Sequence, residues 1–339
     1  MSSRHIVVAV GAYLTVRPRI LAKITHVARA LDAEVELFHC AFDSQPGKAI
    51  DAGSVTSDQQ IRKLIELARY QLEAVAEHLR QAGIRTKVAV CWDYPSYEGI
   101  VREVLRRKPD LLIAQSTRHA KLARWVLTHT DYQLIESCPC PLLLMKSERP
   151  YTDPCIVAAI DPMHANAKPA ALDRAILDNA RLLSQALGGA LHVMHACAPW
   201  PKVMERSPEL RRLPQPVWAE VRAAYEEKAQ SRVNELAHEA GIASDRIHLT
   251  WGEAADQLPS FCDKQSADIV AMGAVSRSGL RRAFIGHTAE RVLDALTCDV
   301  LIVKPPDFKT PRLHIDVGEH ARAFRLQMVD PIGHQGIGR

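Results

Sequence analysis

The chain alternates short apolar runs with longer segments in which apolar residues recur every three or four positions. The short runs, such as HIVVAV (5–10) and DIVAMG (268–273), are apolar at successive residues, which is typical of strands buried on both faces of a parallel sheet. The longer segments, such as 58–83 and 217–241, have the period of amphipathic helices. Strand and helix patterns follow one another along the whole chain, so the sequence predicts an α/β fold.

Five strands are predicted in each half of the chain. They lie at 5–10, 34–42, 86–92, 110–116 and 141–146, and then at 155–161, 190–198, 247–251, 268–273 and 299–304. Helical patterns separate most of them, as parallel pairing requires. We therefore expect two tandem Rossmann- or flavodoxin-like domains, each a five-stranded, mostly parallel sheet with helices on both faces.

The two halves repeat one design. Residues 109–146 align with 267–304 without a gap, and the identities include the pairs His129/His287, Cys140/Cys298 and Lys146/Lys304. The predicted domains are 1–147 and 154–306, joined by the polar, proline-containing segment KSERPYTDP. A tail, 307–339, is expected to be partly disordered.

Composition and charge narrow the class of protein. The 339 residues carry a net charge of +4, and the basic residues are scattered among the acidic ones, which argues against a nucleic-acid partner. No apolar run approaches the length of a membrane span, so no membrane partner is expected. The eight cysteines lie mostly in or beside apolar runs, which predicts reduced thiols in a cytoplasmic protein. Cys138 and Cys140 lack a second pair at ligand spacing, so no metal is predicted.

Ligands of open parallel sheets bind beyond the carboxyl ends of the strands. In the second half the first strand ends at Asp161, the second ends near Ala196, and the fourth ends at Met272 and Gly273. An aspartate at this edge can accept a hydrogen bond from a ribose hydroxyl, and a glycine permits a base or ribose to approach the backbone. These residues are also common at ordinary strand ends, so both interpretations stay open.

The segment VAMGAVSRSGLRRAFIGHTAERVLDAL (270–296) reads as a strand, a polar loop and a helix, an order that can cradle a phosphate. Gly286 precedes the helix, whose N-terminal amides favour anions. Thr288 is expected either to cap that helix or to donate its hydroxyl to a phosphate. The candidate phosphate-neutralising residues are Arg277, Arg281 and Arg282.

On these motifs the sequence resembles the universal stress protein family in its tandem, two-domain form, over about 5–146 and 154–305. ATP-binding members carry Gly, two residues, Gly, nine residues, and then Gly followed by Ser or Thr. Gly273 and Gly286 fit the first and third glycines, whereas Ser276 stands at the second and His287 follows the third. The resemblance implies ATP or AMP as ligand. The nucleotide-binding candidates are Asp161, Ala196, Met272, Gly273, Ser276, Gly286, His287 and Thr288.

The first half departs from this motif. Gln115, Arg118 and Thr128 stand at the three glycine positions, and Gly11 stands about where the strand-one aspartate belongs. The resemblance therefore implies one altered nucleotide-like site in the second half and none in the first. Family members dimerise through their last strands, so it also implies contact or self-association through 141–146 and 299–304.

Three classes of function follow. The first is a cytoplasmic stress-response protein that acts by ligand binding and assembly, without turnover. The second is a scaffold or carrier for an apolar ligand or a protein partner, suggested by the aromatic and proline-rich segment 200–218, which is expected to form a lid or a docking surface. The third is an enzyme such as a weak nucleotide hydrolase, for which no general base or metal cluster stands out near the loop.

Overall fold

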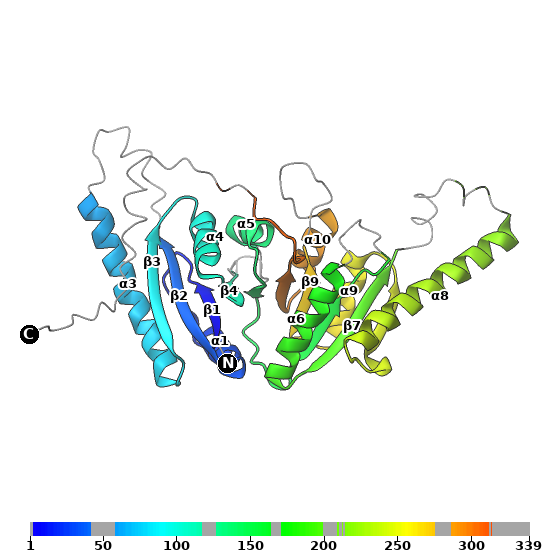
Figure 1. Cartoon of the computed structure of the whole chain (residues 1–339), viewed down its shortest axis with the longest axis horizontal. Coiled ribbons are helices and arrows are strands. Elements are labelled where there is room, and N and C mark those ends of the chain that lie inside the picture. Colours follow the sequence, from blue (N-terminus) through cyan, green and yellow to red (C-terminus); the bar gives the residue numbers. More distant parts are fainter. Residues whose placement is uncertain are drawn as a thin grey trace, which may run out of the picture.

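A computed structural model describes residues 3–41, 58–116, 127–163, 171–198, 214–274 and 286–311, together with residues 209, 212 and 313. These residues form one ten-stranded sheet with helices on both faces, and the molecule is elongated across the strands (Figure 1). The predicted α/β fold with two tandem Rossmann-like halves is confirmed.

Each half follows the predicted order of elements to within a few residues. The first half contains β1 (Arg4–Ala9), α1 (Pro18–Ala30), β2 (Ala33–Ala41), α3 (Asp58–Gln81), β3 (Thr86–Trp92), α4 (Ser96–Arg107), β4 (Leu111–Gln115), α5 (His129–Ser137) and β5 (Leu142–Met145). The second contains β6 (Cys155–Ala159), α6 (Ala171–Leu187), β7 (Ala190–Cys197), α8 (Gln215–Glu239), β8 (Ile247–Trp251), α9 (Ala254–Lys264), β9 (Ile269–Gly273), α10 (His287–Ala295) and β10 (Asp299–Val303).

The sheet has the strand order β3-β2-β1-β4-β5-β10-β9-β6-β7-β8. All neighbouring strands are parallel except β5 and β10, which pair antiparallel with Leu143 opposite Leu301. The contact between the two last strands is therefore made inside one chain, and their backbone edges are not free for a second copy. Self-association of two chains stays a prediction, and the outermost strands of this sheet are β3 and β8.

The continuous apolar character of the strands follows from burial on both faces. Along β1, Ile6 and Val8 pack into one core layer, whereas Val7 and Ala9 pack into the other. The first layer also contains residues of α1, α3, α6 and α8, and the second contains residues of α4, α5, α9 and α10. The central strands must therefore be apolar at successive positions, whereas the outermost strands β3 and β8 are only partly buried.

A buried polar cluster joins the two halves at the centre of the sheet. Asp299, at the start of β10, accepts hydrogen bonds from the backbone N–H groups of Lys146 and Ser147, at 2.8 Å each. Its carboxylate also accepts from the Tyr151 hydroxyl and forms an ion pair with Lys23 of α1. The side chains of Lys23 and Asp299 are 2% and 0% exposed. One carboxylate thus holds together α1, the linker between the halves, and β10.

A second buried cluster gives a testable pH dependence. Glu36 of β2 and Glu103 of α4 are both buried, and Arg107 contacts each carboxylate at 3.0 Å. Burial, followed by the hydrogen bond and the charge of Glu103, raises the pKa of Glu36 to about 7 from the ordinary value of 4.5. The folded protein therefore keeps a proton that the unfolded chain loses, and the stability that this proton contributes is lost as the pH rises from 4.5 through about 7.

We expect Glu36→Gln to remove the loss of stability that accompanies the rise in pH. The free energy of unfolding of the variant should rise relative to the parent by at most about 1.4 kcal/mol per pH unit across that window. Urea unfolding at several pH values measures the difference, and Glu34→Gln, on the same strand but half-buried, is the control. A constant difference from pH 4.5 to 8 would contradict the raised pKa.

Candidate functional site

The strand ends of the second half bring the predicted site residues together. In the sheet, Ala159 of β6 lies beside Met194 of β7 and beside Met272 of β9. Continuing this register by two residues places Asp161 next to Ala196 on one side and next to the end of β9 on the other. Asp161, Ala196, Met272 and Gly273 therefore share the carboxyl edge of three neighbouring strands, as expected from their strand positions.

Asp161 presents a carboxylate at this edge. Its backbone N–H donates to Oδ1 of the buried Asp173, in the first turn of α6, at 2.9 Å, which fixes the chain as it leaves β6. Burial raises the pKa of the Cys197 thiol to about 12, and the Asp161 and Glu226 carboxylates contribute to the same shift. Asp161 thus lies close to the end of β7.

Gly273 has a packing role that the sequence did not show. A Cβ at this position would lie 2.6 Å from Cδ2 of Leu172, a fully buried residue of α6. Helix α6 therefore packs so closely on the end of β9 that a side chain there requires Leu172 to shift. Close packing is sufficient to explain this glycine, whether or not a ligand also approaches it.

The N-terminus of α10 differs from its counterpart in the first half. Helix α5 begins with a capping box, in which Thr128 Oγ1 accepts from the Asp131 N–H at 3.2 Å and Asp131 Oδ2 accepts from the Thr128 N–H at 2.7 Å. In the ungapped alignment of the halves, Gly286 and Ala289 occupy these two positions. Gly286 is the N-cap of α10, and among the described residues no side chain caps that helix.

The prediction that Thr288 caps α10 is therefore wrong. The helix begins at His287, so Thr288 is its second residue and lies in the first turn. An N-cap at Thr288 would start the helix at Ala289, two residues later than observed, whereas the sequence also placed Gly286 directly before the helix, as the structure has it. Thr288 is half-buried.

Several predicted residues lie outside the described part of the chain. They are Ser276, Arg277, Arg281 and Arg282 of the loop, Arg118 of the first half, and most of the segment 200–218. The end of that segment belongs to α8, which begins at Gln215 and includes Val217 and Trp218. The lid and docking interpretations of 200–218 stay predictions.

Two histidines occupy matched positions at the strand ends, and each is hydrogen-bonded to a backbone carbonyl. His39 Nδ1 hydrogen-bonds to the Val10 carbonyl at 2.9 Å, and His195 Nδ1 hydrogen-bonds to the Ile160 carbonyl at 3.0 Å. Each histidine is buried and ties the end of the second strand of its half to the end of the first. Burial lowers the pKa of His39 although the bond to Val10 opposes the shift, so this ring is neutral at pH 7.

The cysteines do not present a metal-binding cluster in the described residues. All eight are free thiols. Cys138 and Cys140 lie with their Sγ atoms 3.5 Å apart, and their mutual hydrogen bond, followed by burial, raises the pKa of Cys140. A thiol with a raised pKa is a poor metal ligand, because metals bind the thiolate. Within the described ranges no three His, Cys, Asp or Glu residues converge.

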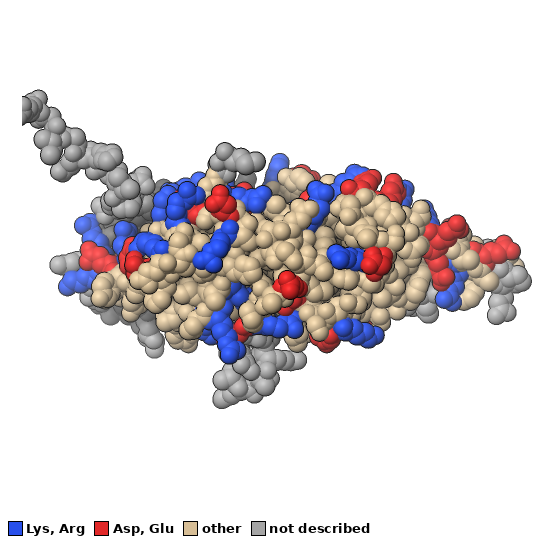
Figure 2. Space-filling view, turned by 90° about the horizontal axis from the view of Figure 1, so that it is seen from below, with Lys and Arg blue, Asp and Glu red and all other residues tan. Residues whose placement is uncertain are grey.

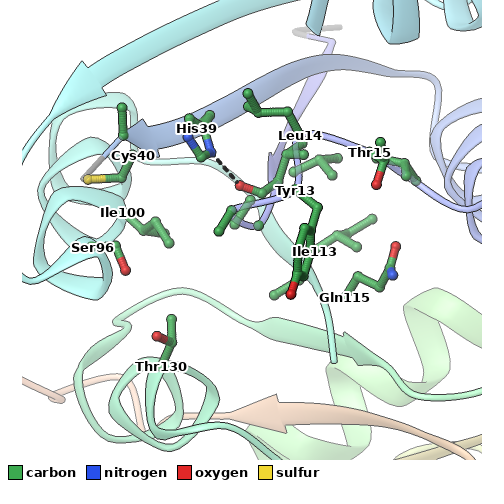
Figure 3. A pocket seen from close by; sticks show the side chains of 18 of the residues that line it. Tyr13, Leu14, Thr15, His39, Cys40, Ser96, Ile100, Ile113, Gln115 and Thr130 are labelled. Atoms are coloured by element: carbon green, nitrogen blue, oxygen red, sulfur yellow. Dashed lines mark hydrogen bonds between the residues drawn. The ribbon is translucent and has the colours of Figure 1, made fainter. Parts of the chain in front are cut away.

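The first half contains a cavity that the sequence did not predict. It has a volume of about 880 Å³ and lies at the carboxyl ends of β1, β2, β3 and β4, where the second half has its predicted site (Figure 3). The loss of the glycine motif in this half predicts that no nucleotide binds there. A sequence motif can indicate whether one class of ligand is bound, but it cannot show whether a cavity is present. This cavity is lined by side chains from strands, helices and loops that are distant in the sequence.

The surface charge is mixed. On the face shown in Figure 2, lysine and arginine side chains are interspersed with aspartate and glutamate side chains. None of the helices in the described part of the chain combines the length and the apolar character that a membrane crossing needs.

Comparison with known proteins identifies the family. The model of the universal stress protein family matches twice, at residues 2–146 and 155–304. Universal stress protein E of Photorhabdus laumondii is 29% identical over 244 residues, covering 71% of this chain and 76% of the relative. The protein of the same name from Escherichia coli K12 is 27% identical over 237 residues, covering 70% and 73%.

Solved structures agree on the fold. A protein of unknown function from Pseudomonas aeruginosa PAO1 is 24% identical, with a TM-score of 0.68 over 90% of this chain and 94% of its own. A universal stress protein from Archaeoglobus fulgidus is 16% identical, with a TM-score of 0.63 over 90% and 100%. The two family matches together span nearly the whole length from β1 to β10. The chain therefore belongs to the universal stress protein family and carries two of its domains in tandem.

Proposed function

We propose that this protein serves the cytoplasmic stress response by binding one nucleotide-like ligand, ATP or AMP, at the carboxyl ends of β6, β7 and β9. Binding and the assembly that it controls are the function, without turnover of the ligand. The observation that carries the proposal is the difference between the two helix N-termini: within the described residues no side chain caps α10, whereas Asp131 closes α5 with its own carboxylate.

The physical argument concerns the first turn of α10. The N-terminal amides of a helix have no partner within the helix, and its dipole places partial positive charge there. Gly286 brings no side chain to this point, and a Cβ built on it would meet no atom within 4 Å. Ala289, unlike Asp131 in the first half, brings no carboxylate. A phosphate group can therefore take the place that Asp131 fills in α5.

The neighbouring strand ends suit the rest of a nucleotide. Asp161 offers an acceptor for a ribose hydroxyl, and the backbone of Ala196 lies on the adjacent strand for an adenine ring. Met272 provides apolar contact at the end of β9.

The proposal is tested by the small molecules that the purified protein retains. Native mass spectrometry of the full chain should show one nucleotide mass per chain, and Gly286→Leu should lose it because a side chain then crowds the first turn of α10. Leu105→Phe on α4 is the control, since Leu105 is an exposed residue of a helix in the first half. If the parent bound neither retained nor added ATP or AMP, the proposal would fail.

A further prediction concerns Ser276, which lies outside the described residues and is considered from the sequence alone. Ser276→Gly restores the glycine spacing of ATP-binding relatives and removes a Cβ from a position where the backbone would approach phosphate. We expect the dissociation constant for ATP to fall by about two- to tenfold. Fluorescence or calorimetric titration measures it, and an unchanged or weaker affinity would show that the loop does not approach a phosphate at Ser276.

A further inference from the structure

The cavity of the first half lies at the switch point of its sheet. Strand β1 is flanked by β2 and β4, and the chain leaves β1 toward one face and β4 toward the other. Crevices at such points are the usual ligand sites of open α/β sheets. A volume of about 880 Å³ lies within the roughly 300–1,000 Å³ range of small-molecule pockets.

The cavity is lined mainly by apolar side chains. They come from helices on both faces of the sheet and from the strands between them. They include Leu14, Ile20, Ile24, Ile100, Ile113 and Leu134. Figure 3 shows Leu14, Ile100 and Ile113 around the same space, with the hydroxyl groups of Ser96 and Thr130 beside it. An apolar ligand with one or two neutral polar groups matches this distribution.

The charged groups at the cavity already have partners. The Arg17 guanidinium forms an ion pair with Glu148, with Nη1 2.6 Å from Oε1. Asp131 accepts from the backbone N–H and the hydroxyl of Thr128, at 2.7 and 3.0 Å. His39 is buried and hydrogen-bonded to the Val10 carbonyl. A charged ligand would have to break one of these pairs in order to gain a counter-ion.

An anion is opposed most directly at the N-terminus of α5. The Asp131 carboxylate already occupies the position in which a phosphate would accept from the helix amides. A second negative charge beside it would be repelled in a site of low polarity. The first half therefore rejects the chemical group that the second half is proposed to accept.

We propose that the cavity of the first half binds an uncharged, mainly apolar small molecule. This site is separate from the nucleotide-like site, and the inference stands whether or not the second half binds a nucleotide. On this proposal the two halves bind different classes of ligand because they differ at two matched positions at the start of a helix. These positions are Thr128 and Asp131 in the first half and Gly286 and Ala289 in the second.

The experiment uses the full chain and the neutral fluorophore N-phenyl-1-naphthylamine. We expect saturable binding of one molecule per chain, with an increase in fluorescence. Two variants fill the cavity from different walls: Gly11→Phe, where a Cβ would meet no atom within 4 Å, and Thr130→Phe in the first turn of α5. Each should weaken binding by at least about tenfold. Leu182→Phe, at an exposed position of α6 in the second half, should not, and circular dichroism checks that all variants are folded.

Competition separates the two sites. Saturating ATP should leave the fluorophore bound, and the anionic analogue 8-anilinonaphthalene-1-sulfonate should bind at least about tenfold more weakly than the neutral dye. Displacement by ATP, equal affinity for the anionic dye, or unchanged binding in both cavity variants would overturn the proposal. If the parent bound ATP but not the neutral dye, this inference would fail while the proposed function survived. If it bound the neutral dye but neither ATP nor AMP, this inference would survive and the proposed function would fail.

Discussion

Replacing Asp299 by alanine should lower the free energy of unfolding by about 3 to 5 kcal/mol, the range typical of breaking a buried ion pair. Asp299 is fully buried and accepts from two backbone N–H groups, at Lys146 and Ser147, as well as from Lys23 and Tyr151. Alanine would leave the Lys23 cation buried without its counter-ion, beside the Ser147 carbonyl at 2.7 Å and the Tyr151 ring. The two N–H groups would lose their acceptor as well.

The same substitution should loosen the connection between the halves, because Lys23 lies on α1 and Asp299 lies on β10. Urea unfolding followed by circular dichroism measures both effects. We expect the midpoint to fall, and any loss of coupling would appear as a second transition. Asp299→Asn is the control: it keeps an acceptor for the backbone N–H groups but loses the charge, so its effect should be smaller. A change below about 1 kcal/mol for the alanine variant would show that the cluster contributes little.

The second large effect is expected from moving the capping box of α5 onto α10. The double variant Gly286→Thr/Ala289→Asp reproduces Thr128 and Asp131 at the matched positions. The new carboxylate would accept from the first-turn amides and repel a phosphate, so the affinity for ATP should fall by about 10- to 100-fold, or about 1.4 to 2.8 kcal/mol. The new cap should also stabilise the fold by about 1 kcal/mol.

This opposite movement of stability and affinity distinguishes the proposal from general damage. Thermal denaturation measures the stability, and titration with ATP measures the affinity. The neutral pair Gly286→Thr/Ala289→Asn, which caps without a charge, should lose less affinity. If the charged variant were more stable and bound ATP as the parent does, α10 would not hold the phosphate.

The sequence predicted the helices and strands well because hydrophobic periodicity and helix-ending residues indicated the same elements. β1 and β9 are continuous apolar runs, and α3 ends where Gly83 adopts a left-handed conformation, with φ at 84°. The ungapped repeat implied that both halves share one topology. Contact between the last strands was implied by the family resemblance, whereas their antiparallel pairing was not predicted, since an apolar strand does not indicate its partner or direction.

The site was predicted less completely, for identifiable reasons. Strand order brought Asp161, Ala196 and Gly273 to one edge, because carboxyl ends of parallel strands coincide. The contact of Gly273 with Leu172 could not be foreseen, since it depends on how closely α6 approaches β9. The cavity of the first half was missed because empty volume depends on side chains that are distant in the sequence.

Titration calorimetry of ATP into the full chain tests most directly the claim that the second half alone holds a nucleotide-like ligand. We predict one site per chain, weakened in the Gly286→Thr/Ala289→Asp variant and unchanged in Leu105→Phe on α4 of the first half. Two equivalent sites per chain, or a single site that the Gly286→Thr/Ala289→Asp substitution leaves unaltered, would contradict it.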